Sequence, residues 1–171
     1  MADETKPNGG EAQTSESGNE GPKVSVLGQY IKDLSFENPN APKSFQEPGQ
    51  NPNLQLNFNV GANKLSDDTY EVTLHFEGAA KSDESGIYQL DLVYAGVFRI
   101  ENFPQERLRP FLFVDCPATL FPFVRRLIAD LTREGGYPPL LIDPIDFAAL
   151  YRRNAAQQQA GAGTENNEAK A

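Results

Sequence analysis

The sequence predicts an α+β fold in which a four-stranded antiparallel sheet is followed by helices that pack on one of its faces. Apolar and polar residues alternate through four segments between residues 31 and 100, which is the period of half-buried strands. Short connections join these segments and favour antiparallel pairing, because parallel strands need long crossovers. From residue 104 onward apolar residues recur at helical spacing, and a sheet followed by helices is typical of the α+β class.

The first predicted strand covers residues 31–37 and has two chemically different faces. Leu34 and Phe36 lie on one face, and Asp33 and Glu37 lie on the other. Two prolines in the NPNAP run that follows remove two amide donors and favour extended geometry in the residues before them, so strand pairing ends there. We therefore expect an apolar underside and an acidic outer strip on a sheet edge that a partner can reach.

Three more strands follow with the same alternation, over residues 54–60, 70–77 and 87–100. Gly96, near the middle of the fourth strand, indicates a bulge or a close backbone approach. The apolar faces consist of Leu54, Leu56, Phe58 and Val60 in the second strand, Tyr70, Val72, Leu74 and Phe76 in the third, and Tyr88, Leu90 and Leu92 in the fourth.

Helices and one apolar loop make up the rest of the domain. Residues 104–114 predict a short helix that is interrupted or ends before Cys116-Pro117, and a longer helix follows. Gly135-Gly136 ends that longer helix as a left-handed cap would. Residues 137–145 hold three prolines and predict an extended crossing loop, after which Asp146 caps a last helix. The apolar stripe of the longer helix consists of Leu120, Val124, Leu127, Ile128 and Leu131.

Length and composition predict a single folded domain between two tails. A chain of 171 residues, 39% of them hydrophobic, provides one core with little room for a second. Both ends of the chain are rich in small and polar residues and cannot offset the entropy that is lost on ordering. We expect a disordered acidic tail over residues 1–22, a folded domain over residues 23–160 and a mobile C-terminal tail over residues 161–171.

Charge and cysteine content exclude several classes of protein. A net charge of -9 at pH 7 argues against a nucleic-acid partner, which requires concentrated Lys and Arg. The single cysteine, Cys116, permits no disulfide within the chain. The N-terminus lacks the apolar core of a secretory signal, and no apolar run approaches the ~18 residues of a membrane helix. We therefore expect a soluble, cytoplasmic protein.

No constellation of residues predicts catalysis. His75 lies on the polar side of its strand without a recognisable nucleophile or orienting carboxylate, and we interpret it as a surface histidine. Cys116 sits at an apolar helical junction, and we interpret it as a buried structural thiol. One Cys and one His provide no zinc set, and Gly135-Gly136 follows a helix where a phosphate loop would open one. The sequence therefore predicts no enzyme, no metal and no cofactor.

Five segments of mixed character occur in order along the chain. They are YIKDLSFENPNAP at residues 30–42, YEVTLHFEGAAK at 70–81, YAGVFRI at 94–100, CPATLFPFVRRLI at 116–128 and GGYPPLLIDPIDFAALY at 135–151. These segments resemble the SecB family, the bacterial chaperones for protein export. The resemblance implies a homotetramer, a dimer of dimers, that acts as a holdase without ATP. Such a protein binds unfolded precursor proteins, keeps them competent for translocation and delivers them to the motor ATPase SecA.

The resemblance also implies a SecA-binding surface on the outer face of the sheet. By matching position, Asp33 and Glu37 in KDLSFE and Asp91 in QLDLVYAG carry this contact. Gln89 stands where other members of the family have a contributing leucine, which leaves the three carboxylates as the main predicted contacts. Without the family, the same charges are those of an ordinary solvated sheet face.

A surplus of apolar residues near the crossing loop and the last helix predicts a groove for client peptides. Extended, proline-rich walls cannot close with their own hydrogen bonds and are suited to binding other chains. In the SecB family the sheet, the crossing loop and the last helix line such grooves, whereas the alternative is that these side chains belong to the core. The predicted groove residues are Phe45, Leu54, Leu56, Phe58, Leu140, Leu141, Ile142 and Tyr151.

Two other functions are compatible with the sequence. One is a SecB-like chaperone or interaction scaffold that has a dedicated partner and no SecA delivery role. The other is a small α+β enzyme with a carboxylate site around Asp67-Asp68 or Asp143 and Asp146. That enzyme would need a deep polar pocket with shifted carboxylate pKa values.

Overall fold

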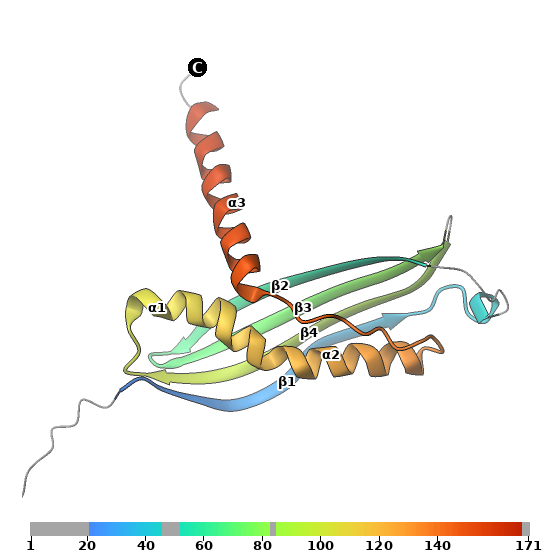
Figure 1. Cartoon of the computed structure of the whole chain (residues 1–171), viewed down its shortest axis with the longest axis horizontal. Helices are drawn as coiled ribbons and strands as arrows, with labels where there is room; N and C mark the ends of the chain where they lie inside the picture. Colours follow the sequence, from blue (N-terminus) through green and yellow to red (C-terminus); the bar gives the residue numbers. More distant parts are fainter. Residues whose placement is uncertain (1–20, 46–51, 83–84, 169–171) are drawn as a thin grey trace, which may run out of the picture.

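The structure is a computed structural model that describes residues 21–45, 52–82 and 85–168. Four strands form one antiparallel sheet in the order β1-β4-β3-β2 (Figure 1). The strands are β1 (Lys23–Glu37), β2 (Asn53–Ser66), β3 (Thr69–Ser82) and β4 (Ser85–Glu101). A 3-10 turn, η1 (Lys43–Phe45), follows β1, and after β4 come α1 (Gln105–Pro110), the π-helical turn η2 (Phe111–Asp115), α2 (Cys116–Glu134) and α3 (Phe147–Glu168). The predicted α+β class is confirmed.

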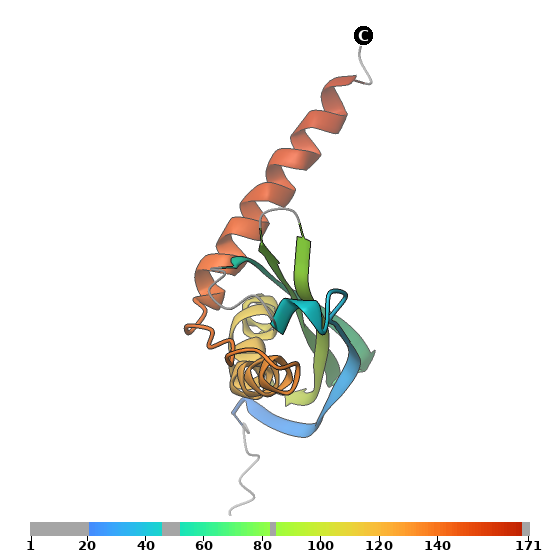
Figure 2. The ribbon, with the colours of Figure 1, turned by 90° about the vertical axis from the view of Figure 1, so that its right-hand side faces the viewer.

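The helical run α1, η2 and α2 and the first turn of α3 lie on one face of the sheet, where they form the core, and the rest of α3 projects away from the sheet (Figure 1). Figure 2 shows α2 against one side of the curved sheet. In the described part of the chain no helix covers the other side. Each large apolar side chain that is buried contributes ~1.5–3 kcal/mol, so this layer fixes the position of α2 on the strands. The core residues without exposed surface include Val72, Leu74, Phe76, Leu90, Leu92, Leu120, Val124 and Ile128.

Strand β1 begins at Lys23, eight residues before the start at residue 31 that its alternation predicts. The register of β1 against β4 is irregular between Val26 and Gly28 and again between Ile31 and Asp33. Each irregularity changes which face the following side chains take, so the first half of the strand shows no simple period of two. The strand is at the edge of the sheet, as the sequence predicts.

The predicted interruption before Cys116-Pro117 takes the form of a π-helical turn. The backbone N–H of Cys116 donates to the carbonyl of Phe111, five residues earlier. Pro110 and Pro117 have no N–H to donate, so the usual hydrogen-bond ladder cannot run unbroken through this region. The segments α1, η2 and α2 are therefore successive parts of one helical run.

Two glycines permit the packing of α2: one allows its close approach to the sheet and the other ends it. A Cβ atom on Gly96 would lie 2.7 Å from Cδ2 of Leu120, so α2 approaches β4 closely at this point. Gly136 has a φ of 88°, in the left-handed region. The N–H groups of Gly136 and Tyr137 donate to the carbonyls of Arg133 and Thr132, which confirms the predicted cap at the end of α2.

The crossing loop between α2 and α3 is anchored to α2 by one buried hydroxyl. Oγ1 of Thr132 accepts a hydrogen bond from the N–H of Leu140 at 2.9 Å and donates to the carbonyl of Ile128 at 2.9 Å. Thr132 has no exposed surface; its bond to Ile128 is buried and its bond to Leu140 is partly buried. The path of the loop over the core is therefore fixed at its start.

Helix α3 starts as predicted and extends further than predicted. The carboxylate of Asp146 accepts a hydrogen bond from the N–H of Ala149 at 2.9 Å, which confirms the cap. The helix runs to Glu168, through most of the segment for which we expect a mobile tail, and that mobility stays a prediction. The predicted tail of residues 1–22 lies almost wholly outside the described residues. No helix of the described ranges is both long enough and apolar enough to cross a membrane.

Candidate functional site

The sheet register brings the four predicted SecA-binding residues onto one face of two neighbouring strands. Glu37 of β1 pairs with Gln89 of β4, and Asp33 and Asp91 lie further along the same ladder. The apolar residues between them point toward the helices, so these four polar side chains point away from the helices. Asp33, Glu37 and Gln89 are exposed and Asp91 is half-buried. The structure thus places all four side chains where a partner could reach them.

Two residues that the sequence did not single out for binding, His75 and Glu77 of β3, extend this face. Nε2 of His75 lies 3.0 Å from Oδ1 of Asp91, and the side-chain amide of Asn57 donates to Oε2 of Glu77 at 2.9 Å. Glu77 also pairs with Asp91 in the ladder. Alternation places both residues on the polar side of β3, but only the register shows that Asp91 is their neighbour. We call the surface formed by Asp33, Glu37, Glu77, Gln89 and Asp91 the acidic face.

His75, Glu77 and Asp91 also form the one group among the described residues that offers three side chains to a metal ion. Their potential ligand atoms lie within 4.8 Å of one another. His75 and Asp91 already contact each other, Glu77 is bonded to Asn57, and the group is open to solvent. A solvated set of mutually bonded polar side chains accounts for this geometry, and we assign it no metal.

A further carboxylate of the outer side, Glu71 of β3, is paired and covered. Glu71 is only 6% exposed, Nζ of Lys32 lies 2.7 Å from its Oε2, and the hydroxyl of Tyr30 donates to its Oε1. The bonds from Lys32 and then Tyr30 hold the pKa of the Glu71 carboxyl below its ordinary value. The same contacts raise the pKa of Lys32 and of Tyr30. Glu71 therefore ties β1 to β3 and adds no free charge to the acidic face.

Four of the predicted groove residues expose large apolar surfaces on the described chain. Leu54 and Leu56 are each 42% exposed on the helix-facing side of the edge strand β2. Phe45 is 48% exposed, and its ring centroid lies 5.5 Å from that of Tyr137 at the start of the crossing loop. Leu141, in the middle of that loop, is 69% exposed. These four side chains are available to a client, and we call them the exposed groove residues.

Other predicted groove residues are covered by the protein itself. Ile142 is only 8% exposed and belongs to the core, so its prediction as a groove wall is corrected here. Leu140 and Phe58 pack against the core, and the Phe58 ring lies 4.9 Å from that of Phe76. The physical reason is alternation in an extended loop, which turns Leu141 outward and Ile142 inward. The sequence shows the apolar run but not which members face inward.

Tyr151 lines a small pocket where α3 passes η2. The cavity has a volume of about 80 Å³, and the rings of Phe113 and Tyr151 lie 6.0 Å apart in its wall. The sequence did not reveal Arg109 or Phe113 as site residues, because chain order does not show that α3 returns to η2. The lining residues of this α3 pocket are Val60, Arg109, Phe113, Leu150, Tyr151, Asn154 and Ala155.

Several residues considered for catalysis have structural roles. Cys116 is 1% exposed, and burial together with the charge of Asp115 raises the pKa of its thiol to about 12. The prediction of a buried structural thiol is confirmed. The carbonyl of Asp68 accepts the N–H of Ile100, and Asp146 caps α3, so both residues have bonding partners within the fold.

Sequence comparison finds one family and many close relatives. Residues 17–158 match the family described as preprotein translocase subunit SecB. A relative named protein-export protein SecB from Bradyrhizobium sp. strain BTAi1 is 52% identical over 144 residues, which cover 84% of this chain and 89% of that protein. The protein of the same name from Zymomonas mobilis subsp. mobilis is 49% identical over 144 residues, covering 84% of this chain and 87% of that protein.

Structure comparison finds a SecB-like fold. The chain resembles the Mycobacterium tuberculosis SecB-like chaperone Rv1957, solved in complex with a ChAD peptide from the HigA1 antitoxin. The TM-score is 0.59 at 17% identity, and the match covers 71% of this chain and 90% of that chain. At this identity the match supports the shared fold.

Proposed function

The chain belongs to the SecB family, and from that premise we propose that it holds unfolded precursors on the helix side of its sheet and meets SecA on the outer side. It is a chaperone of protein export, because relatives of that name are 52% identical over most of its length. One observation carries the two-surface mechanism: the acidic face and the exposed groove residues of β2, Leu54 and Leu56, lie on opposite sides of one sheet.

The exposed groove residues are proposed as the first contacts of an unfolded client. Apolar surface contributes ~25 cal/mol per Å² when it leaves water, so covering ~200 Å² of client and groove gives ~5 kcal/mol. This force needs no ATP and little sequence specificity, as holding varied precursors requires. Tyr151, Phe58 and Leu140 are proposed as the partly buried wall behind those contacts. A client segment bound there is kept from folding and stays competent for translocation.

The acidic face is proposed as the contact for SecA. Among the described residues, Asp33 and Glu37 make no salt bridge within 4.0 Å, and the one partner of Asp91 is His75. Their charges are therefore available to a basic surface, in contrast to the covered charge of Glu71. Unpaired charges of this kind speed association and select complementary partners. Gln89, between the carboxylates, offers a neutral polar contact.

A homotetramer, a dimer of dimers, is proposed from the surfaces that one chain leaves uncovered. The edge strand β1 exposes Val24, Val26 and Ile31 at 40%, 45% and 43%. On α2, Phe123 is 41% exposed and its ring stacks on that of Tyr94 at 6.3 Å. A long apolar edge is a template for pairing with another chain, and self-assembly would cover it. We propose that the assembly works in the cytoplasm as a non-enzymatic chaperone without a cofactor.

Calorimetric titration tests the holdase function. An unfolded secretory precursor and its folded mature form are each titrated into the full-length protein. The proposed function predicts binding of the unfolded chain and no binding of the folded form, since only the former exposes long apolar segments. Absence of binding to either would contradict it. A second, unrelated precursor separates the alternatives, because binding to only one precursor favours a chaperone with a dedicated partner.

A further inference from the structure

His75 is the only histidine of the chain, and it lies on the outer side of β3 beside the acidic face. Its side chain is 33% exposed, and that of Asp91, whose Oδ1 lies 3.0 Å from Nε2 of the imidazole, is 35% exposed. On the other side, in β2, His75 pairs with the uncharged Asn59. The imidazole is therefore open to solvent and in contact with one carboxylate of the proposed SecA contact.

The contact with Asp91 determines which ring nitrogen carries the hydrogen. An ionised carboxylate has no hydrogen to donate, so Nε2 of His75 donates to Oδ1 of Asp91. In the neutral imidazole the other nitrogen, Nδ1, is then without a hydrogen, and it is the atom that takes up a proton. The hydrogen bond orients Asp91 in both forms of the ring, but only the protonated form places a positive charge beside the carboxylate.

Three carboxylates of the acidic face surround His75. The potential ligand atoms of His75, Glu77 and Asp91 all lie within 4.8 Å of one another. Asp33 of β1 and His75 both pair with Val93 of β4, from opposite sides, so they lie in one row across the sheet. One proton added to the ring therefore changes the potential at carboxylates from three strands.

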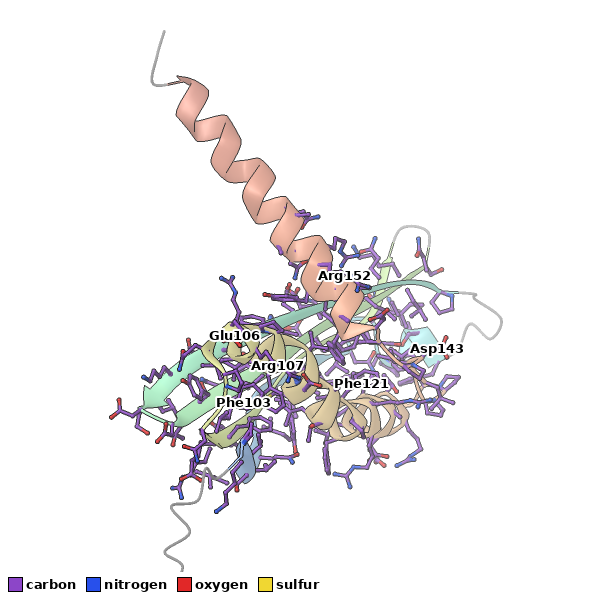
Figure 3. All side chains as sticks on the ribbon, turned by 60° about the vertical axis from the view of Figure 1, so that its left-hand side comes forward. Phe103, Glu106, Arg107, Phe121, Asp143 and Arg152 are labelled. Atoms are coloured by element: carbon purple, nitrogen blue, oxygen red, sulfur yellow. The ribbon has the colours of Figure 1, made fainter. Side chains whose placement is uncertain are left out.

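The nearest cations belong to other contacts. Among the described residues, no Lys or Arg nitrogen lies within 4.0 Å of the three carboxylates. Nζ of Lys32 lies 2.7 Å from Oε2 of Glu71, which it neutralises. Figure 3 shows Arg107 on α1 and Arg152 on α3, two helices that belong to the other side of the sheet. His75 is therefore the group that can add positive charge next to these carboxylates.

We propose that His75 is a positioning residue for Asp91 in the SecA contact, and that protonation of His75 weakens this contact. The inference rests on the proposed binding of SecA at the acidic face and adds its regulation by pH. With neutral His75, Asp91 is oriented by a hydrogen bond and keeps its negative charge for a basic partner. With protonated His75, the imidazolium offsets that charge and repels the same partner.

Calorimetric titration of purified SecA with the full-length protein at a series of pH values tests the proposal. Between about pH 8 and about pH 5, histidine is the side chain that ordinarily changes its charge. Cys116 stays protonated in this range, because burial raises the pKa of its thiol to about 12. Relative to His75→Gln, the wild-type protein should lose about threefold in SecA affinity across the range, the scale of an exposed ion pair.

The comparison with His75→Gln isolates the proton on His75. Glutamine keeps an N–H donor for Asp91 and gains no charge in acid. Titration of groups on SecA contributes equally to both measurements, so it cancels in the ratio of the two affinities. The difference should shrink as salt is raised. Binding of an unfolded precursor is the control readout, and the two proteins should bind it equally at every pH.

Two more variants separate charge from positioning. His75→Lys carries a positive charge throughout the range, so it should bind SecA about threefold more weakly than the wild-type protein at the highest pH and equally at the lowest. His75→Ala leaves Asp91 without its donor, so it should bind SecA more weakly than His75→Gln at the highest pH. Thermal unfolding checks that the variants fold.

The outcomes distinguish this inference from the proposed function. If the wild-type protein and His75→Gln lose SecA affinity in parallel as pH falls, the regulation by His75 is overturned and the SecA contact stands. Equal affinities of His75→Ala and His75→Gln overturn the positioning role. If the wild-type protein does not bind SecA at any pH, the proposed contact and this inference are both contradicted.

Discussion

The two sides of the sheet are built from the same strands and have opposite chemistry. On β4, Leu90 and Leu92 have no exposed surface, whereas Asp91 between them lies on the outer side. The outer side carries free carboxylates, and the helix side carries exposed leucines and one pocket with a cation, Arg109. Strand alternation therefore lets a small domain present two unlike surfaces without a second domain. Substitutions of exposed residues on the outer side should change binding and spare the fold, whereas substitutions of buried residues should affect both.

The largest effect is expected from the core beneath the groove. Phe76→Ala should lower the free energy of unfolding by ~3–5 kcal/mol, because the ring is fully buried against Phe58 and its removal leaves a cavity. His75→Ala, at the preceding position and on the outer side, should cost less than ~1 kcal/mol. Urea unfolding of both variants measures the difference. Similar losses at the two positions would show that the sides are not independent.

A smaller effect is expected where the crossing loop is anchored. Thr132→Val removes the acceptor of the Leu140 N–H and should cost ~1–3 kcal/mol, because that donor loses its buried partner. Loosening the loop should weaken client binding and spare binding at the acidic face. Thr119→Val is the matched control, since the exposed Thr119 hydroxyl only donates to the carbonyl of Asp115. Urea unfolding and client titration check both variants, and a Thr119 effect as large as that of Thr132 would contradict the role of the anchor.

The smallest effect is expected from the covered carboxylate of the outer side. Lys32 and Tyr30 lower the pKa of Glu71, so the stability it contributes is fully present above its unfolded pKa of about 4.3. That contribution is lost as pH falls through the lower folded pKa. Glu71→Gln should therefore reduce stability near pH 7 and flatten its decline in acid, as measured by urea unfolding at a series of pH values. Glu77→Gln, at an exposed position on the same strand, is the control and should cost less stability near pH 7 than Glu71→Gln.

Much of the fold could be predicted because its strands and helices have regular periods. Alternation predicts that the side chains of Leu74 and Leu92 point into the core. The cap at Gly136 is predicted by its position directly after the apolar stripe of α2. The first half of β1 could not be predicted, because register irregularities near Gly28 and Ile31 break its alternation. The local pattern of apolar and polar residues therefore predicts strands and helices well where their geometry is regular, and poorly where a strand bulges.

The site was only partly predictable, because it depends on contacts between distant segments. Resemblance to a family together with alternation predicts Asp33 and Asp91 as candidate contacts, but the contact of Asp91 with His75 depends on the pairing of β3 with β4. Ile142 was predicted to line the groove but lies in the core, because an apolar run does not reveal which of its residues is buried. Arg109 could not be identified, because its pocket exists only once α3 returns to η2.

The most direct test of the two-sided account is to reverse charge on the acidic face and measure both binding activities. In the double variant Asp33→Lys with Glu37→Lys, affinity for SecA should fall on the order of tenfold, because like charges then face each other across the contact. Affinity for an unfolded precursor should be unchanged, since both residues lie on the side away from the exposed groove residues. Equal loss of both activities, or unchanged SecA binding, would contradict the separation of the two surfaces.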